Sequence, residues 1–369
     1  MNILFSPQKL GDLTLPNRIV IPPMCQYSAR DDGKATDWHL MHYGQLACSG
    51  AGLLIVEATA VEPQGRITAH DLGLWSDEAA AAMTPVLRAI RSYSAMPVGV
   101  QLGHAGRKGS AEVPWKGGRQ RSSTSAGGWQ TEAPAELPFD TKDEKPLVLD
   151  AQGIKRIVAA FAAAAGRAAR TGYDLVEIHS AHGYLLHQFL SPISNTRTDA
   201  YGGSLQNRMR LTLEVFEAVR AVFPADKPVT VRISARDWVK GGWSLEDSIA
   251  LTHELKARGC AAIHVSSGGL SPEQNIALGP GYQAPFAAKI KAAVGLPTIA
   301  VGLITEALQA ESLLRAGCAD MIAIGRGMLY DPRWGWHAAA ALGAQVAAPP
   351  MCWRAAPHGV KDVFAPLQE

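Results

Sequence analysis

The sequence predicts a single (β/α)₈ barrel with a long loop that caps its mouth. Two observations carry this prediction. Eight short apolar runs recur along the 369-residue chain, and amphipathic helical patterns lie between them. Most of these runs are continuously apolar, as is typical of parallel strands that are covered on their outer side. A doubly wound open sheet is the main alternative fold for the same alternation.

The eight apolar runs give the expected barrel strands. They are Ile19–Ile21, Leu53–Ala58, Val98–Leu102, Leu175–His179, Val229–Ile233, Ala262–Ser266, Thr298–Val301 and Met321–Gly325. Helical spacing is clearest in one apolar face, formed by Ile154, Ile157, Val158, Phe161 and Ala165.

Two helix starts are predicted from capping residues. Ser244 followed by Asp247 has the spacing of a capping box, and Thr305 is expected to cap the helix after the seventh strand.

One connection is too long for a simple turn. Residues 103–150 are rich in Gly, Pro, Ser and charged residues and show little periodicity. Long loops inside compact domains usually form lids or binding loops. We therefore expect residues 1–369 to form one domain, with 103–150 as a cap over the carboxyl-terminal mouth of the barrel.

Composition excludes several classes of function. Lys+Arg 35 against Asp+Glu 33 gives a net charge of +2, which argues against a nucleic-acid or anionic-membrane partner. No uncharged apolar run approaches the ~18 residues needed to span a bilayer, and no signal peptide is recognised. The five cysteines form no CxxC pair, so we expect a cytoplasmic enzyme without a metal site.

Two glycines at strand ends predict a phosphate site. Gly302 follows the seventh strand and Gly325 ends the eighth, where backbone N–H groups can approach an anion closely. Arg326 adds a guanidinium at the same place. Alternatively, these glycines only form tight turns. No Gly-x-Gly-x-x-Gly motif opens a helix, so a nicotinamide cofactor would bind without a domain of its own.

The fourth strand ends in a cluster of titratable side chains. His179 and His182 are three residues apart and can converge either on a metal ion or on a substrate oxygen. We favour two N–H donors that bind a carbonyl oxygen, with Tyr184 as a phenolic proton donor. The alternative is three polar side chains that only satisfy one another within a loop.

Cys25 follows the first strand and lies next to Tyr27 in sequence, which makes it a candidate for the site. A free cysteine is more commonly a small buried apolar residue. His39 and His42 fall inside a helical pattern, and we interpret them as structural.

Three motifs together resemble the Old Yellow Enzyme family of FMN-dependent ene-reductases, and the resemblance covers essentially the whole chain. They are residues 15–19 with 23–28, residues 177–184 through Pro192, and residues 194–204 with Asn207 and Arg208. The third is the most specific. Cys25 stands where most of the family has threonine, which is similar to the bacterial thermophilic-like (class III) subgroup.

The resemblance implies FMN as cofactor, NADPH or NADH as reductant, and an enone-type small molecule as substrate. It places along the flavin Pro23, Met24, Cys25 and Ala58. It places at the pyrimidine edge Gln101 and Arg232, and at the phosphate Gly302, Gly325 and Arg326.

For the substrate, the resemblance implies that His179 and His182 bind the carbonyl oxygen, that Tyr184 donates a proton, and that Tyr27 borders the pocket. It also implies a homodimer or larger oligomer in which Arg354 reaches the neighbouring subunit's site. Relatives often have tyrosine at the position of Cys352, so the family's pattern does not fix the shape of that shared wall here. Some relatives have tryptophan at the position of Val301, so the site is expected to be roomier in this chain.

Three other functions are compatible with such a barrel. A dienoyl-CoA reductase-like flavoprotein would need closely spaced cysteines for an iron–sulfur cluster, which this chain lacks. A flavin-free phosphate-binding isomerase or aldolase would more naturally show Lys or Glu as a base at a strand end. A non-catalytic flavin-binding protein would leave the cluster of His179, His182 and Tyr184 unexplained.

Overall fold

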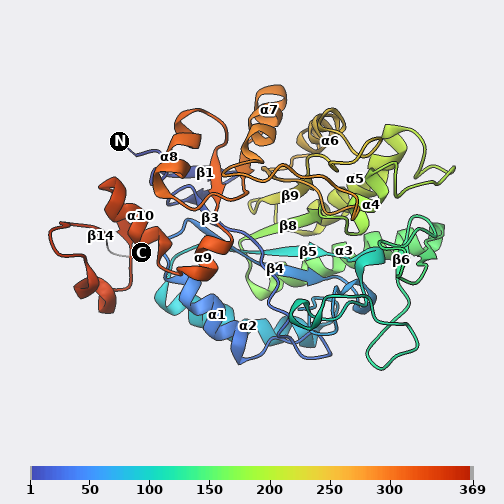
Figure 1. Cartoon of the computed structure of the whole chain (residues 1–369). Coiled ribbons are helices and arrows are strands. Elements are labelled where there is room, and N and C mark those ends of the chain that lie inside the picture. Colours follow the sequence, from blue (N-terminus) through green and yellow to red (C-terminus); the bar gives the residue numbers. More distant parts are fainter. Residues whose placement is uncertain (1, 366–369) are drawn as a thin grey trace.

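Eight parallel strands form a closed barrel at the centre of the computed structural model, which describes residues 2–365 (Figure 1). The strands follow one another around the barrel in chain order, and the last pairs with the first. They are β3 (Ile19–Ile21), β4 (Leu53–Ala60), β5 (Val98–Gly103), β8 (Leu175–Ser180), β9 (Val229–Ser234), β10 (Ile263–Ser266), β11 (Thr298–Ala300) and β12 (Met321–Ala323). The predicted barrel is confirmed, and the open sheet is wrong.

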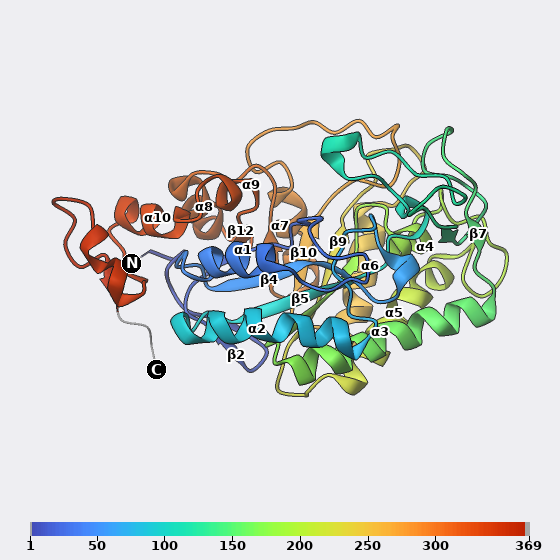
Figure 2. The same ribbon diagram turned by 90° about the horizontal axis from the view of Figure 1, so that it is seen from below.

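Helices surround the barrel, as Figures 1 and 2 show. They are α1 (Asp37–Ala47), α2 (Asp77–Tyr93), α3 (Ala151–Thr171), α4 (Leu185–Leu190), α5 (Leu205–Val222), α6 (Leu245–Ala257), α7 (Ala284–Val294), α8 (Ala307–Arg315), α9 (Arg326–Tyr330) and α10 (Trp334–Leu342). Short 3₁₀ helices are η1 (Pro63–Gly65), η2 (Gly106–Lys108), η3 (Pro114–Lys116) and η4 (Pro350–Ala355). No helix among residues 2–365 is long and apolar enough to cross a membrane.

Helix α3 illustrates why these segments are helical. Its predicted apolar face is buried against the barrel, with only Val158 partly exposed. Asp150 caps the amino-terminal end by accepting a hydrogen bond from the Gly153 amide at 2.7 Å. Gly172 ends the helix in a left-handed conformation, with φ of 96°.

The other predicted helix starts were partly right. The capping box of Ser244 and Asp247 at α6 is confirmed. Thr305 as the cap of α8 is wrong, because Glu306 occupies that position. The backbone of Thr305 is bound instead by the side chains of Gln309 and Trp334.

The last two predicted strands were too long at their carboxyl ends. Strand β11 ends at Ala300 because the chain bends into Gly302, whose φ is 125°. Strand β12 ends at Ala323 because Gly325 is already the N-cap of α9. Both ends therefore leave the sheet where the phosphate site was predicted.

The amino-terminal end of the barrel is closed by the antiparallel hairpin of β1 (Gln8–Leu10) and β2 (Leu13–Leu15). Leu10 and Leu15 pack with Val20, Leu53 and other buried side chains in a cluster separate from the larger helix–strand core. Burial of such side chains contributes about 1.5–3 kcal/mol each. Apolar side chains thus fill the amino-terminal end of the barrel, and the residues at the carboxyl ends of the strands line the open mouth.

The segment 103–150 lies beside that mouth (Figure 2). It contains η2, η3 and the strand pair β6 (Glu132–Ala133) and β7 (Leu147–Val148), which are parallel. Lys108 binds the carbonyl oxygens of His182 and Gly269, both at 2.9 Å, so the segment is attached to the loops after β8 and β10. Its action as a cap stays a prediction.

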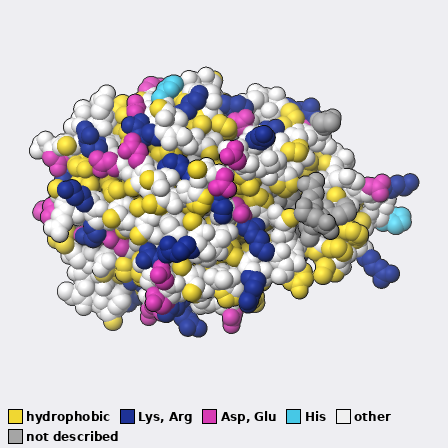
Figure 3. All heavy atoms as spheres, turned by 180° about the vertical axis from the view of Figure 1, so that it is seen from behind, with side chains coloured by type: hydrophobic (Ala, Val, Ile, Leu, Met, Phe, Trp, Pro, Cys, Tyr) yellow, Lys and Arg dark blue, Asp and Glu magenta, His cyan; other side chains and the backbone are white. Residues whose placement is uncertain are grey.

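The surface carries both signs of charge. On the face shown in Figure 3, basic and acidic side chains are interspersed rather than gathered into one large patch of a single sign. This pattern agrees with the near balance of Lys+Arg 35 and Asp+Glu 33.

Candidate functional site

The segment after β3, which carries Cys25 and Tyr27, is held by a buried carboxylate that the sequence did not single out. Glu57 of β4 accepts hydrogen bonds from the Gln26 amide at 2.7 Å and from the Tyr43 hydroxyl at 2.8 Å. Burial raises the pKa of Glu57 to about 8. Tyr27 adopts a left-handed backbone, with φ of 49°, which these contacts help to fix.

Cys25 and Tyr27 lie together at the mouth. Burial, with the nearby charges of Asp71 and Glu57, raises the pKa of the Cys25 thiol well above its usual value, so the sulfur stays protonated at neutral pH. Tyr27 hydrogen-bonds with Cys25. The Tyr27 ring packs edge-on against Trp115 of η3, with the ring centroids 6.0 Å apart. The segment 103–150 therefore supplies one aromatic neighbour to this part of the site.

The two predicted histidines converge. His179 Nε2 and His182 Nδ1 lie 3.5 Å apart, with the rings nearly perpendicular. The Ala181 amide donates to His179 Nδ1 at 3.3 Å, which leaves the proton of a neutral ring on Nε2. Burial, reinforced by the charge of Arg232, lowers the pKa of both imidazoles well below the usual value, so both are neutral.

A serine that the sequence analysis missed holds the other histidine. Ser266 Oγ lies 2.7 Å from His182 Nε2 and donates to Gln283 Oε1 at 3.3 Å. Gln283 Oε1 also accepts from Ser267 Oγ at 2.6 Å. The His182 ring is therefore held by Ser266 at Nε2, while its Nδ1 faces His179. Ser266 ends a predicted strand, the same signal that identified His179.

Tyr184 stands next to this pair. Its ring packs edge-on against His179, with centroids 5.0 Å apart, and its hydroxyl has no hydrogen-bond partner among residues 2–365. Burial raises the pKa of Tyr184, so the phenol stays protonated. A small pocket between the strand ends is lined by Tyr184, His179, Ala58 and Asp71, among others.

Lys108 is a third residue that the sequence analysis missed. Its ammonium lies 5.1 Å from the Tyr184 ring centroid and 4.5 Å from that of Phe139. Burial, followed by the charge of Arg107, lowers the pKa of Lys108 to about 8. The amine therefore loses its charge closer to neutrality than an exposed lysine does.

Arg232 is a buried cation without a hydrogen-bond acceptor in the described part of the chain. Its side chain is 8 % exposed, and it has no hydrogen bond to any of residues 2–365. Gln101 of β5 donates an Nε2–H to Glu177 at 2.8 Å, and the charge of Glu177 acts on Arg232. A guanidinium without an acceptor and an amide group, both on barrel strands next to Glu177, fit the acceptor and donor edge of a flavin pyrimidine ring.

Glu177 is in turn fixed by His264, whose Nδ1 lies 2.8 Å from Oε2. Both side chains are buried inside the barrel. This pair gives Gln101 a fixed orientation and places a negative charge near Arg232, which partly offsets the burial that lowers the pKa of Arg232.

The predicted phosphate residues gather on one side of the mouth. A Cβ at Gly302 would lie 2.7 Å from Gln283 Nε2 and 3.1 Å from the Tyr282 ring. Gly325 lies beside Pro22 and Met24 of the segment after β3. Arg326 is exposed, acts electrostatically on Tyr282, and has no ion pair within residues 2–365. At Gly302 a side chain would collide with its neighbours, so the backbone there stays uncovered. Together with the Arg326 guanidinium, this fits a site for a phosphate group.

Two expectations involve residues away from the mouth. Arg354 of η4 is exposed and forms no hydrogen bond or ion pair in the described part of the chain, so a single copy does not join it to the histidines. His39 and His42 are buried in α1, where His39 Nδ1 accepts from the Thr36 amide at 3.0 Å. That contact agrees with the structural interpretation of His39.

One group of metal-ligand type lies elsewhere. Side-chain atoms of Glu62, His104 and Glu132 lie within 4.8 Å of one another. Arg156 contacts both carboxylates, so the group is an ion-pair network.

Replacing Arg232 by methionine tests the cofactor fit. Hydrogen bonds to a charged group contribute ~1.5–3 kcal/mol, so the dissociation constant for FMN should rise on the order of 10- to 100-fold. Flavin fluorescence quenching measures it. Arg236→Met is the matched control, because Arg236 is exposed and lies over Trp238. Equal affinity in the two variants would remove Arg232 from the flavin site.

Comparison with known proteins adds the family to these geometric observations. The family model described as NADH:flavin oxidoreductase / NADH oxidase family matches residues 3–344. An NADPH dehydrogenase of Listeria innocua serovar 6a is 46 % identical over 356 residues, which are 96 % of this chain and 99 % of that protein.

Solved structures resemble it as well. Morphinone reductase in complex with tetrahydroNAD has a TM-score of 0.76 at 28 % identity, covering 99 % of this chain and 95 % of that one. An old yellow enzyme homologue from Zymomonas mobilis has a TM-score of 0.73 at 26 % identity, covering 89 % and 90 %. The matched family range, residues 3–344, includes all eight barrel strands.

Proposed function

The chain belongs to the NADH:flavin oxidoreductase / NADH oxidase family, as a relative of the Old Yellow Enzymes, and on that premise we propose that it is an ene-reductase. It is an NAD(P)H-dependent flavin oxidoreductase with FMN as cofactor. The proposed substrate is an alkene conjugated to a carbonyl or a related nitro or maleimide group. The observation that carries the proposal is the 3.5 Å approach of His179 Nε2 and His182 Nδ1.

The proposed FMN site uses the strand-end residues described above. Gln101 and Arg232 would hold the pyrimidine edge, and Gly302, Gly325 and Arg326 the phosphate. Along the ring would lie Pro23, Met24, Cys25 and Ala58. When bound, FMN supplies the redox chemistry, taking hydride from NAD(P)H and delivering it to an electron-poor carbon.

The histidines bind and polarise the substrate. Their two N–H groups share one acceptor, the carbonyl oxygen, on which negative charge grows as hydride adds to the β-carbon. Because both rings are neutral and are held in place by Ala181 and Ser266, they need little rearrangement during the reaction.

Tyr184 completes the addition. Its protonated phenol stands beside His179 and donates its proton to the α-carbon, so that the alkene gains one hydride and one proton. Tyr27 and Trp115 border the substrate from the side of the segment 103–150. Arg354 of a second subunit is proposed to complete the wall in a homodimer or larger assembly.

Ser266→Ala tests how His182 is positioned. Without the hydroxyl, His182 Nε2 loses its partner at 2.7 Å, and the ring is no longer held in its place beside His179. We expect the Michaelis constant for 2-cyclohexenone to rise and kcat to fall, together on the order of 10-fold in kcat/KM, as for a lost hydrogen bond. Ser267→Ala is the matched control, since Ser267 is the next residue and bonds Gln283 and Tyr282 rather than His182. Equal losses in both variants would refute the assignment.

The proposed function is tested by an anaerobic absorbance titration of the FMN-loaded protein. We expect NADPH to bleach the flavin band and 2-cyclohexenone to restore it. If the protein binds no FMN, a flavin-free barrel enzyme is the better description. If FMN binds but NADPH does not bleach it, the protein is a non-catalytic flavin binder. If only the enone fails, the substrate class is wrong while the cofactor assignment stands.

A further inference from the structure

Two consecutive residues of the site have a left-handed backbone, His182 with φ of 58° and Gly183 with φ of 74°. Such a conformation is unfavourable for histidine and persists only where neighbouring groups fix it. Gly183 has no room for a side chain, because a Cβ there would lie 2.2 Å from the Gly269 carbonyl oxygen. We call these two residues the His182–Gly183 turn.

Side chains bind every backbone polar group of this turn. The His182 amide donates to Ser234 Oγ at 2.9 Å, and the His182 carbonyl accepts from Lys108 Nζ at 2.9 Å. The Gly183 carbonyl accepts from Gln188 Nε2 at 2.7 Å, and the Gly183 amide donates to His187 Nδ1 at 2.9 Å. The conformation of the backbone that carries His182 and leads into Tyr184 is therefore fixed by hydrogen bonds to side chains. The backbone hydrogen bonds of a helix or a sheet do not contribute to it.

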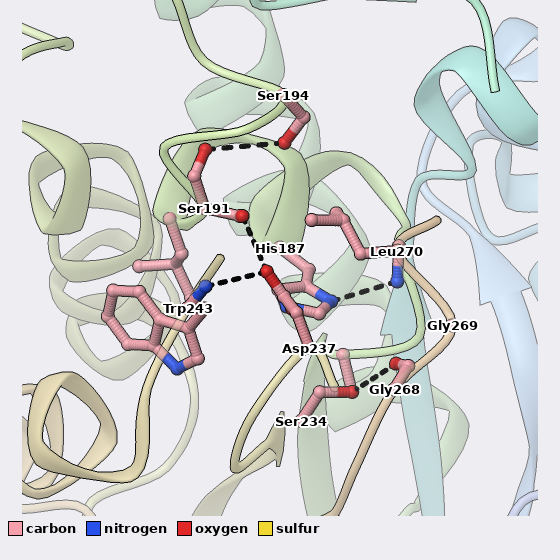
Figure 4. A network of polar contacts seen from close by, with 12 residues as sticks. His187, Ser191, Ser194, Ser234, Asp237, Trp243, Gly268, Gly269 and Leu270 are labelled. Atoms are coloured by element: carbon pink, nitrogen blue, oxygen red, sulfur yellow. Dashed lines mark hydrogen bonds and ion pairs between the residues drawn. The ribbon is translucent and has the colours of Figure 1, made fainter. Parts of the chain in front are cut away.

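One of these side chains belongs to a fully buried pair. His187 Nε2 lies 2.9 Å from Asp237 Oδ1, and neither side chain is exposed. The other oxygen of Asp237 accepts from Ser191 Oγ at 2.6 Å and from the Trp243 amide at 2.7 Å. Figure 4 shows Asp237 between His187, Ser191 and Trp243, with the Ser234–Gly268 hydrogen bond close by.

The protonation state of this pair follows from its contacts. His187 Nδ1 accepts the Gly183 N–H, so it carries no proton, and the proton of a neutral ring is on Nε2, the atom that lies 2.9 Å from Asp237 Oδ1. Burial opposes ionisation of Asp237, but His187, Ser191 and the Trp243 amide outweigh it and lower the pKa of that carboxyl. An ionised Asp237 thus selects the form of His187 that accepts from Gly183.

We propose that His187 and Asp237 are positioning residues for the substrate-binding donors, acting through the Gly183 amide to hold the His182–Gly183 turn. The inference rests on the proposed function, since it assigns the pair to the placement of His182 and Tyr184. Neither residue touches the substrate. His187 lies on α4 and Asp237 in the loop after β9, so the pair joins two elements behind the turn.

The test is Asp237→Asn. Two donors, Ser191 and Trp243, face one side of the side chain and only His187 faces the other, so the amide oxygen should stay with the two donors. The amide NH₂ then faces His187 Nε2, so this nitrogen must accept and the ring proton moves to Nδ1. A proton on Nδ1 opposes the Gly183 N–H, and the hydrogen bond between them is lost. Ser191→Ala is the matched control, because it removes a hydrogen bond from the same carboxylate and leaves the His187 contact intact.

Four readouts separate positioning from stability. For Asp237→Asn loaded with FMN, we expect kcat/KM for 2-cyclohexenone to fall on the order of 10- to 100-fold, as for a misplaced binding group. Binding of cyclohexanone, followed by flavin absorbance, should weaken with it, while FMN affinity stays unchanged. Ser191→Ala should lose a similar amount of thermal stability but keep both values near those of the parent protein.

Nitrogen-15 histidine NMR supplies the fourth readout. The parent protein should show His187 with its proton on Nε2, and the His182 signals should move in Asp237→Asn but not in Ser191→Ala. A proton on His187 Nδ1 in the parent protein, or equal losses in the two variants, overturns the inference. A parent protein that fails to reduce 2-cyclohexenone overturns the proposed function instead, and the NMR comparison still decides the positioning.

Discussion

Replacing Tyr184 by phenylalanine should slow the reoxidation of the flavin by 2-cyclohexenone by on the order of 10²- to 10⁴-fold, the usual contribution of a general acid. The variant keeps the ring that packs against His179 and removes only the hydroxyl, which has no hydrogen-bond partner within residues 2–365. FMN affinity should be unchanged. Stopped-flow absorbance of the pre-reduced protein mixed with enone measures the effect directly.

Tyr201→Phe provides the control, because the Tyr201 hydroxyl binds Glu214 of α5 instead of facing the histidine pair. Burial raises the pKa of Tyr184, so the phenol should remain a proton donor across the neutral and mildly alkaline range. An unchanged rate in Tyr184→Phe for every enone tested would mean that the proton comes from another source.

Replacing His179 by leucine should lower kcat/KM for the enone by on the order of 10²- to 10³-fold, or about 2.7–4 kcal/mol, as for the loss of one oxyanion donor. Leucine fills much of the buried ring position but offers no N–H to the carbonyl oxygen. Steady-state kinetics with 2-cyclohexenone gives the value, and FMN affinity should change little.

The matched control is His42→Leu. His42 is also buried, and its Nε2 has no partner among residues 2–365, so its loss removes no hydrogen bond of that atom. If His179→Leu behaved like His42→Leu, the histidine pair would have to be assigned a structural role.

The barrel, and the gathering of the candidate site residues at one mouth, could be predicted because both depend on local pattern. Apolar runs marked the strands, and residues at or just after the ends of those runs, such as His179 and Arg326, were carried to one mouth by the parallel topology. Strand ends were less accurate at β11 and β12, where Gly302 and Gly325 redirect the chain before the apolar run stops.

The supporting residues were not predicted, because their roles depend on contacts across the sequence. Glu57 binds a segment about 31 residues earlier, and Asp237 reaches His187 across 50 positions of the chain, so no spacing rule connects them. Lys108 lies in the irregular segment 103–150, where periodicity gives no side-chain direction. The role proposed for Arg354 depends on a second copy, which one sequence does not display.

The pairing of β12 with β3 has a consequence for how the protein matures. The barrel closes only when its last strand meets its first, and Gly325 then lies beside Met24, about 300 residues away in sequence. During synthesis, a chain still lacking its last strands has the segment with Cys25 but no phosphate side, and such long-range pairing forms slowly. Tight capture of FMN should therefore come late, after ring closure, and should then shift the folding equilibrium toward the finished protein by mass action.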